Sequence, residues 1–283
     1  MIKKLFGALA LSLSFSAAAL AADGGYPLDR APKHVSDVAS LQSGAKYFVN
    51  YCLSCHSANA MRYNKLNDIG LTDDEISENL LFTSEKVGDL MTIAMRKDDA
   101  AKWFGAAPPD LSVTARALSE NLGASGTDYI YTYLRTFYRD VNRPTGWDNL
   151  VFPSVGMPHV LWQEQGPMRM EHKKIEKVTD EKGYEFWKQT ITHYDEHGFS
   201  TVDSQILADY TGDKVDSKRL VAVDEGQQKA YDLAVADLSN FMGWMAEPMQ
   251  QERKTIGYFV LAFLLFFFFV AWRLNKAYWK DIK

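Results

Sequence analysis

Cysteine occurs at only two of the 283 positions of this chain, and both lie in one pentapeptide, Cys52-Leu53-Ser54-Cys55-His56. On a helical turn, residues i and i+3 leave from the same face, so both thiols can reach the two vinyl groups of one porphyrin. His56, at i+4 from Cys52, can then place an imidazole nitrogen on the iron. The C-x-x-C-H spacing is typical of covalent haem attachment. We therefore expect one covalently bound haem c.

Two other uses of paired cysteines fit the sequence less well. A thioredoxin-like dithiol has no need of the histidine, and no βαβ pattern surrounds the motif. A zinc site needs a second pair of ligands, and the chain has no further cysteine to supply one. Haem attachment is therefore the interpretation that we carry forward.

The start of the chain indicates export. Residues 1–22 begin with Lys3 and Lys4, continue with an apolar run and end near Ala19-Leu20-Ala21, a small-residue cleavage signal. This pattern is typical of a secretory signal peptide. An uncleaved anchor is the alternative, but the apolar run is too short to span a bilayer.

A second apolar stretch predicts a transmembrane helix near the other end. Residues 256–272 carry no charge, and their length is near the lower limit of about 17–25 residues that a bilayer requires. The larger group of Lys and Arg follows the stretch, which the positive-inside rule places in the cytoplasm. A buried core helix is the alternative, and the basic tail argues against it. We predict a signal peptide at 1–22, a periplasmic haem domain at 23–252, and a single-pass anchor with a short cytoplasmic tail at 253–283, in a bacterial inner membrane.

The predicted periplasmic domain is strongly acidic. The whole chain has 31 basic and 36 acidic residues. Two of the basic residues lie in 1–22, and six basic and one acidic residue lie in 253–283. The remaining 23 basic and 35 acidic residues give residues 23–252 a net charge of −12. Such a field attracts a cationic partner and repels nucleic acid, although acidity can also serve solubility alone.

A constrained loop about a hundred residues after the haem motif offers an iron ligand. A haem bound through one His needs a sixth ligand if it is to transfer electrons without opening to other molecules, and Met is usual where the potential is high. Of the ten methionines, Met157 stands out because Gly156 and Pro158 flank it. His159 is its nearest rival, and the residues alone leave that choice open.

Apolar residues at helical spacing predict a mainly α fold. A stripe from Leu41 to Cys52 predicts a helix that ends in the haem motif and is capped by Ser40. Asp110 is the expected N-cap of a later helix, since it follows a Pro-Pro turn. Pro248 interrupts the last helix before the membrane, so we expect a kink there.

Residues 160–223 are expected to form an insertion with a small β-hairpin. Residues 184–192 have strand-like composition, and a turn separates them from a second strand at 175–179. A solvated surface hairpin is the favoured interpretation, and contact with a partner subunit is the alternative. Three histidines of the insertion are expected to be exposed or packed rather than metal ligands: His172, His193 and His197.

The chain resembles the cytochrome c1 family, the haem subunits of the quinol–cytochrome c reductase (cytochrome bc1) complex. Four landmarks carry the resemblance in family order: the C-x-x-C-H motif, Pro108-Pro109-Asp110-Leu111-Ser112 with Arg116, Gly156-Met157-Pro158, and Trp244-Met245-Ala246-Glu247-Pro248. The second and fourth are more specific than the haem motif. The family often has Gly-Met-Ala-Pro-Pro, whereas Pro158 follows Met157 directly in this chain.

The resemblance implies a cytochrome c-like haem domain with one C-terminal transmembrane helix. It assigns thioether bonds to Cys52 and Cys55. It further assigns iron ligation to His56 and Met157, and contact with a haem propionate to Arg116. The implied function is single-electron transfer from a Rieske iron–sulfur protein to a soluble c-type cytochrome, beside cytochrome b in a dimeric complex. The chain would then be an electron-transfer subunit and no enzyme by itself.

Two other functions stay open. One is a haem sensor or peroxidase-like protein, in which Met157 leaves the iron site open and the reduced protein binds carbon monoxide. The other is the monohaem subunit of a terminal oxidase, which would purify without cytochrome b and a Rieske protein.

Overall fold

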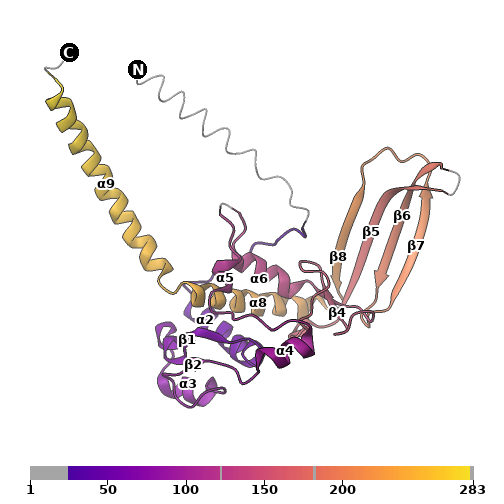
Figure 1. Cartoon of the computed structure of the whole chain (residues 1–283), viewed down its shortest axis with the longest axis horizontal. Helices are drawn as coiled ribbons and strands as arrows, with labels where there is room; N and C mark the ends of the chain where they lie inside the picture. The colour runs from indigo at the N-terminus through magenta and orange to yellow at the C-terminus, as the bar shows by residue number, and fades with distance from the viewer. Residues whose placement is uncertain (1–24, 122, 181–182, 281–283) are drawn as a thin grey trace.

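The structure, a computed structural model, describes residues 25–121, 123–180 and 183–280 (Figure 1). The predicted signal peptide at 1–22 lies outside the described residues. The described chain forms a helical body, a projecting β-sheet and a long terminal helix.

The helical body contains most of the shorter elements. Its helices are α2 (Val38–Tyr47), η1 (Phe48–Cys52), η2 (Tyr63–Ile69), α3 (Asp73–Asn79), α4 (Lys97–Phe104), α5 (Thr114–Ala117), α6 (Gly126–Arg135), α7 (Trp162–Gln165) and α8 (Glu225–Ala246). Two antiparallel strand pairs join them: β1 (Ala58–Arg62) with β2 (Leu90–Met91), and β3 (Phe137–Arg139) with β4 (Trp147–Asn149).

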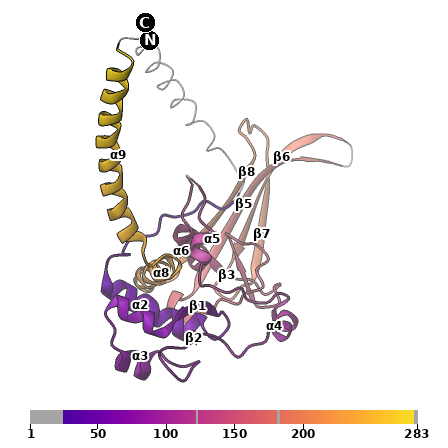
Figure 2. The same cartoon turned by 60° about the vertical axis from the view of Figure 1, so that its left-hand side comes forward.

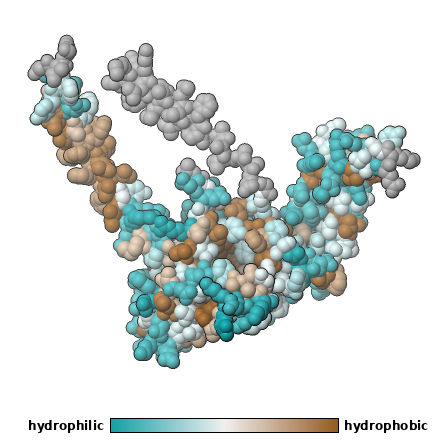
Figure 3. All heavy atoms as spheres, in the orientation of Figure 1, coloured by the Kyte–Doolittle hydropathy of each residue, from teal (hydrophilic) through white to brown (hydrophobic). Residues whose placement is uncertain are grey.

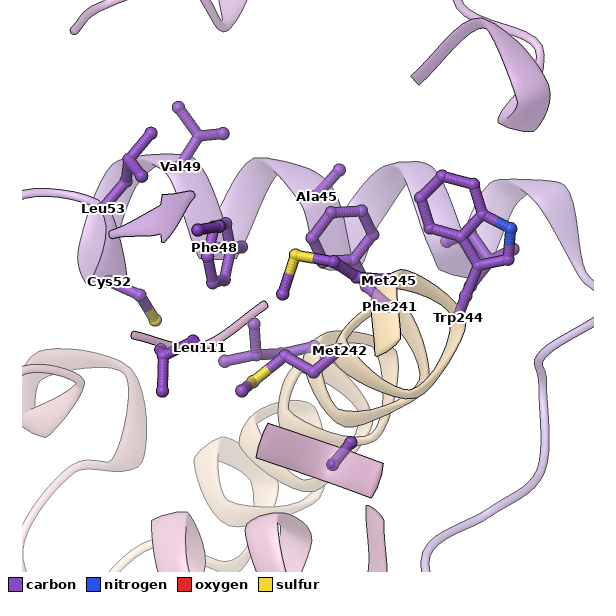
Figure 4. Packing of buried hydrophobic residues seen from close by; sticks show 14 of the residues in the cluster. Ala45, Phe48, Val49, Cys52, Leu53, Leu111, Phe241, Met242, Trp244 and Met245 are labelled. Atoms are coloured by element: carbon purple, nitrogen blue, oxygen red, sulfur yellow. The ribbon is translucent and has the colours of Figure 1, made fainter. Parts of the chain in front are cut away.

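Helices α2 and α8 pack closely against each other inside this body. A Cβ atom on Gly44 would meet the backbone oxygen of Asp237 and lie 2.6 Å from Cβ of Phe241, so only glycine permits this approach. Phe48 is fully buried, and its ring centroid lies 5.6 Å from that of Phe241. Figure 4 shows these side chains between the two helices. The predicted apolar stripe therefore faces α8.

The first helix begins earlier than predicted. Asp37, not Ser40, is its N-cap, and the Asp37 carboxylate accepts hydrogen bonds from the backbone N–H groups of Ala39 and Ser40. Ser40 instead lies inside the helix, where its hydroxyl donates to Asp237 of α8 at 2.5 Å. The prediction that Ser40 caps this helix is therefore wrong, and Asp37, an equally favoured capping residue type, takes that role.

The chain breaks between α8 and α9 (Gln250–Tyr278) where a kink was expected. Glu247 has φ −153° and ψ 71°, which is outside the helical region. Glu247 precedes Pro248, and the proline ring disfavours helical dihedrals in the preceding residue. Two separate helices therefore meet at this point.

Helix α9 is long and apolar enough to cross a membrane. All of its residues are at the surface of the described chain, and Figure 3 shows a hydrophobic band between two hydrophilic ends. A helix that is apolar on every side has no polar face for contact with water. A lipid bilayer is therefore its suitable environment. By its length and composition, α9 fits a single-pass C-terminal membrane anchor.

The insertion is a four-stranded antiparallel sheet with the order β7-β6-β5-β8. Its strands are β5 (Met168–Thr179), β6 (Glu185–Tyr194), β7 (Ser200–Leu207) and β8 (Val215–Ala222). The predicted hairpin is present as β5 and β6. The sheet is nevertheless larger than a small hairpin, so the prediction of a mainly α fold is confirmed only in part. In β7 and β8 the apolar residues do not alternate regularly with polar ones, which is why these two strands gave little signal.

The sheet projects from the helical body and is strongly twisted (Figures 1 and 2). A small core joins its base to the body: buried Met170 packs with Tyr138 and Leu150, and half-buried Tyr194 and Leu220 pack against them. Beyond this base, the sheet is held together by backbone pairing and by side-chain contacts, such as that of Trp187 with Tyr210, whose ring centroids lie 5.1 Å apart.

Candidate haem site

The predicted attachment motif forms one tight turn at the end of η1. The N–H groups of Cys55 and His56 donate to the carbonyl oxygen of Cys52 at 3.1 and 2.8 Å. Both cysteines are free thiols, Cys52 buried and Cys55 half-buried. Figure 4 shows the Cys52 sulfur on the side of Leu111. Burial, followed by the nearby Cys55, raises the pKa of Cys52 to about 12, so this thiol is neutral.

The imidazole of His56 is oriented by a backbone carbonyl. Its Nδ1 lies 2.8 Å from the oxygen of Pro109, and a carbonyl can only accept, so Nδ1 carries the proton. Nε2 is then unprotonated and has a free lone pair for a metal. Burial lowers the pKa of His56, which also favours the neutral ring. His56 therefore has the tautomer that an iron ligand needs.

Asp110 fixes the loop that supplies this carbonyl. Its carboxylate accepts from Asn59 N–H at 2.7 Å, from Ser57 Oγ at 2.8 Å and from Ser112 N–H at 2.9 Å. Burial raises the pKa of Asp110, but these hydrogen bonds outweigh burial and hold it below its usual value. The prediction that Asp110 caps the next helix is wrong, since α5 begins at Thr114. The carboxylate is instead engaged by residues 57–59.

Met157 lies in the loop after β4, half-buried, and contacts α6. The hydroxyl of Tyr133 donates a hydrogen bond to Met157 Sδ at 3.4 Å. Burial, followed by nearby Tyr129, raises the pKa of Tyr133, so the hydroxyl stays a donor. A Cβ on Gly156 would lie 2.8 Å from the carbonyl oxygen of Phe104, so the loop passes close to α4. The helical spacing of Tyr133 and the other aromatic residues of α6 indicates core packing or a wall of the haem pocket, but it gives no sign of the contact with Met157.

His159, the rival of Met157, packs among aromatic rings. Its side chain is 2 % exposed, and its ring stacks on Phe137 at 4.6 Å and meets the edge of Trp147 at 5.0 Å. Burial lowers the pKa of His159 to about 3. Neither ring nitrogen has a hydrogen-bond partner among the described residues. We keep Met157 as the proposed sixth ligand.

Arg116 links two of the four landmarks. It lies in α5 with 65 % of its side chain exposed, and its Nη1 lies 3.8 Å from Oε1 of Glu247. Glu247 also pairs with Arg253 at the start of α9, at 2.5 Å. The structure thus places Arg116 beside the junction with the membrane anchor. Its contact with a haem propionate stays a prediction.

The histidines of the insertion have carboxylate neighbours. His172 Nε2 lies 2.8 Å from Asp216 Oδ1, on the adjacent strand β8. His193 Nδ1 lies 3.7 Å from Glu171 Oε2, directly across β5 and β6. These contacts are local to the sheet.

The donor set fits a haem c. Two free thiols leave from one turn, the adjacent imidazole has Nε2 available, and a half-buried thioether lies in a fixed loop. This body is joined to one apolar helix that can cross a bilayer. Fold and site together define a membrane-anchored c-type cytochrome.

The family is shown by comparison with known proteins. A model of the cytochrome C1 family matches residues 30–177 and 212–282. Cytochrome c1 of Allochromatium vinosum is 41 % identical over 266 residues, 94 % of this chain and 93 % of the relative. A protein named ammonia monooxygenase gamma subunit, from Nitrosomonas europaea, is 42 % identical over 255 residues, 90 % and 88 % of the two chains. Cytochrome b/c1 of Bradyrhizobium diazoefficiens is 24 % identical over 272 residues, 87 % of this chain and 34 % of the relative.

The chain belongs to the cytochrome c1 family. Membership implies a covalently bound c-type haem and makes the chain the haem subunit of a cytochrome bc1 complex. The two matched ranges leave out residues 178–211, which hold β6 and β7. The outer half of the projecting sheet therefore lies outside the family pattern.

Proposed function

We propose that the chain transfers single electrons from a Rieske iron–sulfur protein to a soluble c-type cytochrome. The observation that carries the proposal is the orientation of His56 by Pro109, which joins the haem motif to the second family landmark. Haem c supplies a one-electron ferric–ferrous couple when it is bound. The geometry of the site supports the following roles for the chain's own residues.

Four side chains would hold the group. Cys52 and Cys55 would anchor it through thioethers, and His56 Nε2 and Met157 Sδ would ligate the iron. With both side chains bound, the haem would supply electron exchange and would not bind a substrate at the iron. The exposed guanidinium of Arg116 would neutralise a propionate. The chain would then carry out no bond-making chemistry by itself.

The membrane anchor supports a periplasmic location for the haem domain. Most of the Lys and Arg residues around α9 follow the apolar stretch, which supports a cytoplasmic C-terminus in a bacterial inner membrane. The hinge at Glu247 and Pro248 then sets the body at a defined height above the bilayer. Cytochrome b is the expected membrane neighbour, in line with the name of the Bradyrhizobium relative. A dimeric complex is part of the same proposal.

The charge of the domain supports a cationic electron acceptor. Residues 23–252 have a net charge of −12, so a basic cytochrome would be attracted over long range. Such attraction weakens with salt, because the Debye length falls from about 30 Å at 0.01 M to about 10 Å at 0.1 M.

Purification through a tag on this chain tests the proposal. Cytochrome b and a Rieske protein should accompany the chain, and quinol should reduce its haem. Transfer to a basic soluble cytochrome should slow as salt rises. Absence of cytochrome b and the Rieske protein would favour the terminal-oxidase alternative, and tight binding of carbon monoxide by the reduced protein would favour an open iron site.

A further inference from the structure

We infer that Tyr133 and Asn149 form a positioning pair that holds the Met157 sulfur and raises the reduction potential of the haem. The inference rests on the proposed role of Met157 as sixth ligand and adds two residues that neither the sequence motifs nor the family landmarks include. Two observations support it: the hydrogen bond from Tyr133 to the Met157 sulfur, and the buried side-chain amide of Asn149, which bonds to the backbone of Tyr133.

The hydrogen bond uses a lone pair that metal ligation leaves free. Tyr133 Oη lies 3.4 Å from Met157 Sδ, within the range for a sulfur acceptor. A thioether sulfur has two lone pairs, so one can face the iron while the other accepts from Tyr133. The Tyr133 ring is itself held, since it stacks on Tyr129 at 6.1 Å and meets the edge of Phe137 at 5.1 Å. The donor therefore has a fixed position.

The side chain of Asn149 connects Tyr133 to the Met157 loop. It is 1 % exposed, and its Nδ2 donates to the carbonyl oxygen of Tyr133 at 2.7 Å. Its Oδ1 accepts from the N–H groups of Val151 and Phe152 at 2.9 and 3.0 Å. One buried amide therefore ties the last turn of α6 to the start of the loop. Loss of this amide would leave several buried backbone groups unpaired.

A second contact holds the middle of the same loop. Asp148 Oδ1 accepts from Ser154 N–H at 2.7 Å, and Ser154 has the loop's left-handed backbone at φ 65°. Arg143 lies beside this carboxylate, with Nε 3.7 Å from Oδ2. The loop is thus fixed at residues 151, 152 and 154, just before Met157.

The hydrogen bond that Tyr133 donates to the Met157 sulfur should raise the reduction potential of the haem. A hydrogen bond draws electron density from the sulfur, so the sulfur donates less to ferric iron, and the ferrous state gains relative stability. Hydrogen bonding around an axial ligand is one of the recognised controls of haem potential. Loss of the Tyr133 hydroxyl should therefore lower the reduction potential of the haem and make the Met157 sulfur easier to displace from the iron.

Tyr133→Phe in the purified complex is the decisive variant, because it removes one hydroxyl and keeps the ring. We expect a lower reduction potential and an altered thioether–iron absorption band in the ferric state. Imidazole should displace the sulfur at a concentration on the order of two- to tenfold lower, the equivalent of one neutral hydrogen bond. Covalent haem content should not change. Tyr131→Phe is the matched control: it lies on the same helix, but its ring faces Arg135 at 4.4 Å, so it should leave all three readings unchanged.

Asn149→Ala tests the second member of the pair. It should shift the potential and the imidazole affinity in the same direction, although the Tyr133 hydroxyl is retained. The shifts of the two single variants should not add in the double variant, because both act on one sulfur. If Asn149→Ala does not accumulate, Tyr133→Phe decides alone.

The outcomes separate this inference from the proposed function. Wild-type potential and imidazole affinity in Tyr133→Phe, together with a large fall in potential in Met157→Ala, would overturn the positioning role and leave Met157 as ligand. An unchanged potential and absorption band in Met157→Ala would remove Met157 as ligand, and with it the axial assignment of the proposed function.

Discussion

In the helical body, side chains from distant parts of the chain fill one core, whereas the projecting sheet is built from neighbouring strands whose side chains are mostly half-buried or exposed. Phe48 and Phe241 meet across almost two hundred residues and are fully buried. On β7, every residue from Ser200 to Ile206 is exposed. The family model matches the body and leaves out β6 and β7. The haem motif, Met157 and Arg116 all lie in the body, so the part with the densest packing is also the part that carries the site.

The two regions should therefore respond differently to the same kind of substitution. In the body, deletion of an apolar group leaves a cavity and a misplaced haem ligand. On the outer strand β7 of the sheet, the exposed side chains have few neighbours to lose. The following variants test this contrast.

The largest effect is expected for Phe48→Ala. The ring is fully buried between α2 and α8, one turn before Cys52, so its removal leaves a cavity. We expect a loss of about 3–5 kcal/mol in the free energy of unfolding. Thermal denaturation followed through haem absorbance would measure it. A loss below about 1 kcal/mol would show that this helix pair is not the centre of the core.

A smaller loss is expected for Gly44→Ala, on the same helix. The new Cβ would meet the Asp237 carbonyl and Phe241, so α2 and α8 must separate. Overpacking of this kind costs about 1–3 kcal/mol. Gly88→Ala is the matched control, because nothing lies within 4 Å of its Cβ position. Equal melting temperatures for the two variants would contradict the close α2–α8 contact.

Asp110→Asn should cost about 1 kcal/mol at neutral pH, similar to the loss of a helix cap. The folded-state pKa of Asp110 is lowered, so its contribution is present above about pH 4 and is lost as the pH falls through the folded value. The difference in melting temperature between wild type and variant should therefore shrink below about pH 4. A difference that persists at lower pH would mean that the Asp110 charge is not what holds the Pro109 loop.

The smallest effect is expected in the sheet. Ile206 is 67 % exposed on β7, so Ile206→Ala should change the free energy of unfolding by no more than about 0.5 kcal/mol. The haem potential and the rate of electron transfer should stay at wild-type values. A clear fall in either quantity would show that the sheet acts on the site or on a partner subunit.

The same contrast explains how much could be predicted from the sequence. Cys52, Cys55 and His56 are adjacent in the chain, so their spacing was sufficient to identify the motif. The β5–β6 hairpin was also found, because its turn and its apolar residues are local. Strands β7 and β8 were missed, since their apolar residues do not alternate regularly with polar ones and the strands are defined by pairing.

Contacts between distant segments could not be predicted. Tyr133, which contacts Met157, and Asn149, which bonds to Tyr133 and the following loop, could not be recognised from a sequence motif. Each contact arises only when α6 and the loop after β4 come together. The choice of Asp37 over Ser40 as N-cap and the engagement of Asp110 by residues 57–59 have the same origin. For Ser40 and Asp110, the side chain contacts a distant segment in place of the helix end that its position suggested.

Mass spectrometry of the digested, denatured chain tests the central claim most directly. The account predicts that the peptide containing residues 52–56 carries the mass of one haem, and that neither Cys52 nor Cys55 reacts with an alkylating reagent. A peptide of unmodified mass whose two thiols both react, with all colour lost to the denaturing solvent, would contradict it.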